Sequence, residues 1–290
     1  MPDEQSAILT CALTGPIADK SDNPNLPVTP EEIAQAAAGA HAAGAAVVHV
    51  HIRDENGRPT ADVELARRTV GLIQEQCQAL VQLSTGVGLH VPFEERELLV
   101  HAGPRMASLN PCSMSFADGE FRNPPDGVRR LAARMLELDI KPELEIYDTG
   151  HLEVALRLVE DGLVGEPLSL SIVMGVRGGM PATPEALIQL VGRLPAGSVW
   201  QAIAIGRPNL RMTALALAMG GNARTGMEDT LMLRRGVPAE SNAQLVERLV
   251  GVVDALERTP ATVGDVEERL GLTSSRASAS AEPRQASRPK

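Results

Sequence analysis

Eight short runs of apolar residues recur along the chain, each separated from the next by a segment with helical spacing of apolar positions. The runs lie at 7–15, 45–54, 80–88, 106–116, 141–148, 168–176, 198–206 and 221–229. Short apolar runs bounded by turn residues are typical of buried strands. Their strict alternation with helical segments predicts parallel strands joined by right-handed crossovers.

Several helical segments carry clear start signals. In "VTPEEIAQAAAGAHAAG", Thr29 stands as N-cap, Pro30 at the first helical position, Glu32 in the capping-box position and Gly44 as a stop. The segment "ATPEALIQLVGRL" repeats the Thr-Pro start at residues 183–184. These signals predict that two of the crossover helices begin at positions 30 and 184.

Polar residues gather where the predicted strands end. They are Thr14, Arg53, Asp54, Ser84, Thr85, Asn110, Tyr147, Asp148, Arg177, Arg207, Glu228 and Asp229. An α/β barrel places its active site at the carboxyl ends of all its strands. The alternative, an open doubly wound sheet, usually has fewer strands, and no G-x-G-x-x-G follows the first strand. We therefore predict a single-domain (β/α)8 TIM barrel over residues 1–272.

Composition narrows the function. Residues 273–290 are rich in Ser, Ala, Arg and Pro, and we predict a disordered tail there. A net charge of −10 and only 2% aromatic residues argue against a nucleic-acid partner. The three cysteines form no C-x-x-C pair, and neither a basic leader nor an apolar stretch of about 20 residues is present. A cytoplasmic enzyme without membrane contact is expected.

The stretch "VVHVHIRD" at 47–54 carries the first candidate chemistry. In a strand, residues two apart share a face, so His49 and His51 project together. Two satisfied core histidines are one interpretation. The position at a barrel strand's end favours the other, a pair of imidazole ligands for Zn²⁺ or another divalent metal.

A third ligand is expected from another strand. His151, near a strand end, is a minor candidate. The last strand closes the barrel beside the first and one position from the second, and its end supplies Glu228 and Asp229. Glu228 would be the metal ligand, and Asp229 would be the base or a hydrogen-bonding partner of the ligands. The other interpretation is a helix N-terminus, where acidic residues are common.

The order of motifs resembles one enzyme family. "VTPEEIAQAA", "AAVVHVHIRDENGRPT", "LSTGVG", "KPELEIYDTGHL" and "IGRPNLRMTALALAMGGNARTGMEDT" follow the pattern of the β-keto acid cleavage enzymes (BKACE), with the likeness running from about residue 6 to 272. The resemblance implies a zinc-dependent α/β barrel, one zinc per chain, assembled as a dimer or tetramer of identical subunits. It also implies a reaction in which a 3-keto acid condenses with acetyl-CoA and the product is cleaved to acetoacetate and a new acyl-CoA.

The resemblance also implies roles for particular residues. The metal ligands would be His49, His51 and Glu228, the catalytic base Asp229, and its partner Arg224. Ser84 and Ser108 would donate hydrogen bonds to an oxyanion. One glutamate of the P-E-L-E strand would also act, and we choose Glu143 over Glu145.

Four residues are predicted to contact the substrate: Thr14, Asn110, Arg177 and Asn222. Members that use amino-bearing substrates carry a glutamate where we place Thr14, Arg177 stands where proline is frequent, and Asn222 replaces a usual histidine. These departures indicate a neutral or anionic substrate rather than an amine.

The ends of the seventh and eighth strands often bind phosphate in barrels, so Gly206, Arg207 and Gly221, with Gly220, are predicted to meet the phosphates of CoA. Glycine also ends helices, which is the other interpretation. Three alternative functions remain: a metal-dependent hydrolase, an aldolase or lyase that needs no CoA, and a metabolite-binding barrel without activity. Two histidines and a carboxylate would also suit Fe(II).

Overall fold

The computed structural model describes residues 5–272, and the predicted tail at 273–290 lies outside the described residues. Eight parallel strands form a closed barrel in the order β10-β11-β2-β3-β4-β5-β8-β9. These strands are β2 (Leu9–Ala12), β3 (Val47–Val50), β4 (Leu80–Leu83), β5 (Met106–Leu109), β8 (Lys141–Ile146), β9 (Ser169–Met174), β10 (Val199–Ala204) and β11 (Asn222–Thr225). The predicted barrel is confirmed, with each strand shorter than the run that predicted it.

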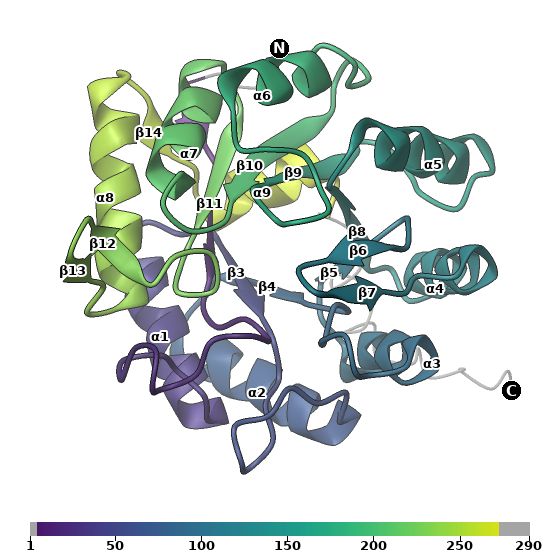
Figure 1. Cartoon of the computed structure of the whole chain (residues 1–290), viewed down its shortest axis with the longest axis horizontal. Helices are drawn as coiled ribbons and strands as arrows, with labels where there is room; N and C mark the ends of the chain where they lie inside the picture. Colours follow the sequence, from purple (N-terminus) through teal and green to yellow (C-terminus); the bar gives the residue numbers. More distant parts are fainter. Residues whose placement is uncertain (1–4, 273–290) are drawn as a thin grey trace, which may run out of the picture.

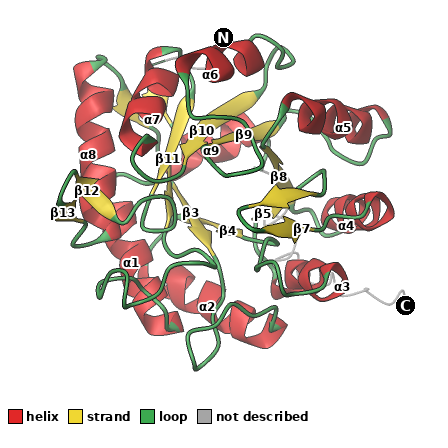
Figure 2. Cartoon of the chain, viewed as in Figure 1, coloured by secondary structure: helices red, strands yellow, loops and turns green. Residues whose placement is uncertain are grey.

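Helices surround the strands on the outside (Figure 2). They are α1 (Pro30–Ala42), α2 (Val63–Gln76), α3 (Phe93–Arg96) with the 3₁₀ helix η1 (Glu97–Ala102), α4 (Pro125–Glu137), α5 (Thr149–Glu160), α6 (Pro184–Val191), α7 (Asn209–Ala218), α8 (Asn242–Ala255) and α9 (Val263–Leu270). Thr29 caps α1 in a full capping box with Glu32, and Thr183 caps α6, so both predicted starts are confirmed. No helix among the described residues is long and apolar enough to cross a bilayer.

Alternation along β3 separates the core from the site. Val48 and Val50 are fully buried in the cluster that also holds Ile33 of α1 and Val70 of α2. Each such side chain contributes about 1.5–3 kcal/mol by leaving water. Because neighbouring residues point to opposite faces, this packing turns His49 toward the barrel axis.

The two ends of the barrel are built differently. Helix α9 lies against the amino end, where Val266 packs with Val47, Leu80 and Met106; it is seen behind the barrel centre in Figure 1. At the amino end, β1 (Ser6–Ala7) also pairs with β14 (Thr259–Pro260). A closed amino end leaves the carboxyl end for the site.

Two antiparallel hairpins stand on the loops of the carboxyl end (Figure 1): β6 (Met114–Phe116) with β7 (Gly119–Phe121), and β12 (Met232–Arg234) with β13 (Val237–Pro238). The predicted strand at 106–116 is therefore two elements, because the chain turns after Leu109 and its last residues enter β6. The β6–β7 hairpin covers one side of the barrel mouth.

Candidate active site

The polar ends of the strands meet at a cavity of about 710 Å³ at the carboxyl end of the barrel. Among the residues predicted from the sequence, six line it: His51, Ser84, Asn110, Arg177, Arg224 and Glu228. His49 and Asp229 lie immediately beneath, nearly inaccessible to solvent. The sequence thus located the correct end of the barrel.

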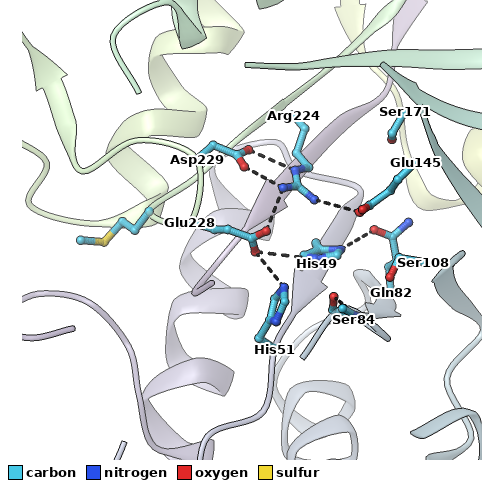
Figure 3. A network of polar contacts seen from close by, with 12 residues as sticks. His49, His51, Gln82, Ser84, Ser108, Glu145, Ser171, Arg224, Glu228 and Asp229 are labelled. Carbon is cyan, nitrogen blue, oxygen red and sulfur yellow. Dashed lines mark hydrogen bonds and ion pairs between the residues drawn. The ribbon is translucent and has the colours of Figure 1, made fainter. Parts of the chain in front are cut away.

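His49, His51 and Glu228 form one compact cluster (Figure 3). The Nε2 atoms of both histidines lie 3.6 Å from Oε2 of Glu228, and the ligand atoms all fall within 4.8 Å of one another. Strand β11 lies between β10 and β2, and β2 pairs with β3, as expected for a closed barrel. The predicted third ligand therefore reaches the histidine pair. His151 lies on α5 beside Tyr147, outside this cluster.

The donor atoms of this cluster fit a divalent metal ion. Nε2 of His49 and Oε2 of Glu228 are buried and have no hydrogen-bond partner. Burial lowers the pKa of His49 to about 3, so its imidazole is neutral and Nε2 keeps a lone pair. Buried polar atoms without partners are rare in proteins, and two that face each other beside a second imidazole are typical of a metal site.

A hydrogen-bonded relay sets the tautomer of His49. Gln82 donates from Nε2 to Oε2 of Glu143 at 2.7 Å, which directs its Oε1 to Nδ1 of His49, also at 2.7 Å. Gln201 donates to the same Glu143 oxygen at 3.0 Å. With the proton on Nδ1, the Nε2 atom of His49 faces Glu228 unprotonated. Such outer partners hold a metal-binding histidine in its working orientation.

Replacing Gln82 with leucine is expected to lower the affinity for a divalent metal by about 10–100-fold, because His49 would lose the acceptor that fixes its ring. A competition titration against a chromophoric chelator measures the affinity. The Q74L variant, changed at an exposed position of α2, serves as control. An unchanged affinity in Q82L would show that the relay does not orient His49.

The loop after β11 is held tightly enough to place Glu228. Gly226 has φ +140°, a backbone conformation that favours glycine. A Cβ at this position would lie 2.1 Å from the carbonyl oxygen of Ala12, so only glycine lets the loop come this close to β2. The amide of Glu228 donates to that same carbonyl at 3.2 Å. Asn242 joins the two loops, accepting from Met227 N at 2.8 Å and donating to Leu13 O at 2.9 Å.

Arg224 connects the predicted metal ligand Glu228 to the predicted base Asp229 (Figure 3). It donates from Nη2 to Asp229 Oδ1 at 2.6 Å and from Nε to Asp229 Oδ2 at 3.1 Å. The same Nη2 donates to Glu228 Oε1 at 2.9 Å, and Nη1 lies 4.0 Å from Oε1 of Glu145. One guanidinium thus holds two carboxylates by charge-assisted hydrogen bonds and lies beside a third.

The protonation of these groups follows from burial and from this guanidinium. Burial opposes the charge on Arg224, but Asp229 and Glu228 outweigh it and keep its pKa well above the ordinary value. Burial also raises the pKa of Glu228, yet Arg224 and the two histidines leave that pKa below its usual range. Burial raises the pKa of Asp229 to about 6 against the influence of Arg224. Asp229 is therefore a stronger base than an ordinary aspartate while remaining mostly ionised near pH 7.

The two glutamates of β8 lie at different depths of the barrel. Glu145 lines the cavity, approaches Arg224 and accepts a hydrogen bond from the Tyr147 hydroxyl at 3.0 Å; burial raises its pKa to about 7. Glu143 lies one layer deeper, in the relay to His49. We chose Glu143 over Glu145 as the functional glutamate of this strand, but it is Glu145 that lines the cavity. Both side chains face the barrel axis, so alternation along the strand does not distinguish them.

The two serines also differ in depth. Ser84 lines the cavity. Ser108 is fully buried, accepts from the amide of Thr85 at 3.0 Å, and supports the end of β4 from below. Asn110 lines the cavity with Oδ1 unpartnered, whereas Thr14 lies buried behind its wall.

Two predicted contacts lie at the wrong end of the barrel. Asn222 begins β11, donating to Trp200 O at 2.8 Å and accepting from Ile8 N at 2.8 Å near the amino end. Gly221 precedes it, and a Cβ there would lie 2.4 Å from the Trp200 ring. The predictions of substrate and CoA contact at these positions are wrong, because a loop from helix to strand emerges at the amino end. Gly206 follows β10 at the correct end, where its amide donates to Asp229 O at 2.6 Å, and Arg207 beside it is exposed.

A closed parallel barrel with a His-His-Glu cluster and a buried Arg-Asp pair at its carboxyl end defines an α/β-barrel enzyme with a candidate metal site. The profile of the BKACE family, described as beta-keto acid cleavage enzyme, matches residues 6–272. The chain belongs to this family.

Two relatives agree with this assignment, and a solved structure shares the fold. The chain is 37% identical to the 3-keto-5-aminohexanoate cleavage enzyme of Acetoanaerobium sticklandii, over 93% of this chain and 99% of that one. It is 34% identical to the 3-oxoadipate:acetyl-CoA acetyltransferase of Cupriavidus necator, over 93% and 96%. A ternary complex of ObcA with a C4-CoA adduct and oxalate has a TM-score of 0.74 at 23% identity, covering 86% of this chain and 68% of that one, and shares the barrel fold.

Proposed function

We propose that the protein is a zinc-dependent β-keto acid cleavage enzyme that condenses a 3-keto acid with acetyl-CoA and cleaves the product to acetoacetate and a new acyl-CoA. The observation that carries the proposal is the convergence of His49, His51 and Glu228 beside an Asp229 held by Arg224, with His49 Nε2 and Glu228 Oε2 buried and without hydrogen-bond partners. The named activities of the relatives support the same reaction class.

Asp229 would remove the proton from C2 of the keto acid. Its two oxygens are both fixed by Arg224, so the carboxylate stays in one orientation, and its raised pKa brings its basicity nearer to the working pH. A divalent ion bound by the His-His-Glu cluster would supply Lewis-acid stabilisation of the negative charge that develops on the substrate oxygens.

One carbon–carbon bond would then form and another would break. The C2 carbanion attacks the thioester carbonyl of acetyl-CoA, and the CoA thiolate leaves. The thiolate attacks the keto carbon C3, the C2–C3 bond breaks, and the released acetoacetate carbanion takes back the proton from Asp229. Ser84 would donate a hydrogen bond to the tetrahedral oxyanion, with Ser108 positioning the end of its strand.

Other residues of the site would support these steps. Glu145 would keep Arg224 in place from the opposite side of the cavity. Asn110 would contact the substrate, and Gly206 and Arg207, at the carboxyl end of β10, would meet the CoA phosphates.

The decisive assay incubates the protein with acetyl-CoA and a panel of 3-keto acids and follows acyl-CoA species and acetoacetate by mass spectrometry. The D229N variant keeps the shape of the side chain but lacks the base, and its kcat is expected to fall by at least about 100-fold. D254N on α8, outside the barrel, is the matched control.

Metal analysis accompanies the assay, and about one zinc per chain is expected. Acid products that form without CoA would contradict the proposal and favour the hydrolase or the lyase. Iron in place of zinc with unchanged products would revise only the identity of the metal.

A further inference from the structure

The cavity at the barrel mouth has a charged side and an apolar side. Its charged side lies over β3 and β11, with His51, Glu228 and Arg224. Its apolar lining comes from the β6–β7 hairpin, from β9 and from loops: Ile17, Leu89, Phe116, Phe121, Val173 and Ile205. A substrate whose reacting atoms meet the charged side must place its remaining carbons against the apolar side.

Two of the apolar side chains are exposed in this structure. Ile17 is 74% exposed and Leu89 46%, although both line the cavity. Large exposed aliphatic side chains that gather at a cavity mouth mark a surface that a ligand covers. The ring of Phe116 packs against two other aromatic rings of the lining, 6.0 Å from that of Phe121 and 6.1 Å from that of Tyr147. We call the apolar side of the cavity the apolar wall. Covering this wall stabilises an apolar ligand in proportion to the area buried.

The charges around the cavity are already paired with one another. Arg224 donates to Asp229 and Glu228, and its Nη1, which has no hydrogen-bond partner, lies 4.0 Å from Oε1 of Glu145. Glu145 in turn accepts a hydrogen bond from the Tyr147 hydroxyl.

At the rim, the guanidinium of Arg177 donates to Asp118, and both side chains are largely exposed. His90, also at the rim, is exposed. Each buried charged side chain of the described lining therefore already faces a group of opposite charge. A second carboxylate would have to compete with Asp229 and Glu228 for Arg224, and an ammonium group would have to compete with Arg224 for its carboxylates.

We propose that the acyl group which this protein transfers from the 3-keto acid to CoA is uncharged and apolar, an alkyl chain that lies against Ile17 and the wall formed with Leu89, Phe116, Val173 and Ile205. The inference rests on the proposed function and specifies its substrate class. It separates this chain from the two named relatives, whose substrates carry an amino group and a second carboxylate.

Three keto acids of equal carbon number test the proposal with the zinc-loaded full chain and acetyl-CoA. They are 3-oxohexanoate, 3-oxoadipate and 5-amino-3-oxohexanoate. The kcat/KM for formation of acyl-CoA is expected to be at least about tenfold higher for 3-oxohexanoate than for either charged compound, because burying an unpaired charge is far less favourable than burying a methyl group. An equal or higher value for a charged compound would overturn the inference while leaving the proposed function intact. Absence of acyl-CoA from all three compounds and from the wider panel would overturn the proposed function, and the inference with it.

Substitutions of the exposed Ile17 test whether the apolar wall determines the substrate preference, because they do not disturb the hydrophobic core. I17E is expected to lower kcat/KM for 3-oxohexanoate and to raise it for the amino compound, and I17R to raise it for 3-oxoadipate. I188E, at an isoleucine 54% exposed on α6 and outside the cavity lining, is expected to change none of the ratios. I17E could instead raise the KM for acetyl-CoA and leave the ratios of kcat/KM among the three keto acids unchanged. The apolar wall would then contact CoA, and the placement of the acyl group would be wrong.

Discussion

Replacing His49 with alanine is expected to lower the affinity of the site for a divalent metal by more than about 100-fold, a larger effect than that expected for the loss of Gln82. Turnover is expected to be lost together with the metal. His49 is nearly fully buried, and its Nε2 faces Glu228 without another partner. Its loss leaves two protein donors where a catalytic zinc usually has three. Metal content per chain after dialysis and the competition titration measure the change.

H51A is expected to behave in the same way, since its Nε2 lies at the same distance from Glu228. H101A, at an exposed histidine of η1, should retain both the metal and the activity. Circular dichroism distinguishes loss of the metal from loss of the fold. Full metal content in a folded H49A protein would contradict the assignment of the site.

Replacing Arg224 with methionine is expected to lower the free energy of unfolding of the metal-free protein by about 3–5 kcal/mol, the usual effect of removing one partner from a buried ion pair. Asp229 and Glu228 would remain buried without their shared cation. The same change frees the Asp229 carboxylate to rotate, so kcat should fall by at least about 100-fold. Denaturant titration and the acyl-CoA assay measure the two effects.

R224K separates charge from geometry. Lysine keeps the positive charge but has no planar fork, so it should recover most of the stability and little of kcat. Recovery of both in R224K would mean that the orientation of Asp229 is unimportant. Loss of neither in R224M would contradict the role of the cluster as a whole.

Alternation and turn chemistry made much of the architecture predictable. Apolar runs separated by capped helical segments define strand and helix locally, and Thr29 and Thr183 start their helices as expected. The pairing of His49 with His51 follows from the two-residue period of a strand. The meeting of this pair with Glu228 follows from barrel closure, which places the last strand beside the first.

Depth along the barrel axis was not predictable in the same way. Glu143 and Glu145 share a face of β8, and only the register of β8 against β9 and β5 places the second at the cavity and the first beside Gln82. Gln82 itself stood out only as one amide in the apolar run "LVQL", and a lone amide does not indicate what it bonds. Asn222 and Gly221 were misplaced because the start of a short strand was taken for its end.

The sequence by itself determined the alternation of elements, the inward face of each strand and the residue types of the site, because these depend on interactions between near neighbours in the chain. Only the tertiary structure decided which inward residues share a layer, how Arg224 holds Asp229 and Glu228 beside Glu145, and which apolar side chains line the mouth. Those outcomes depend on the stagger of strands around a closed barrel and on how loops far apart in sequence pack, and neither is encoded in any single local pattern.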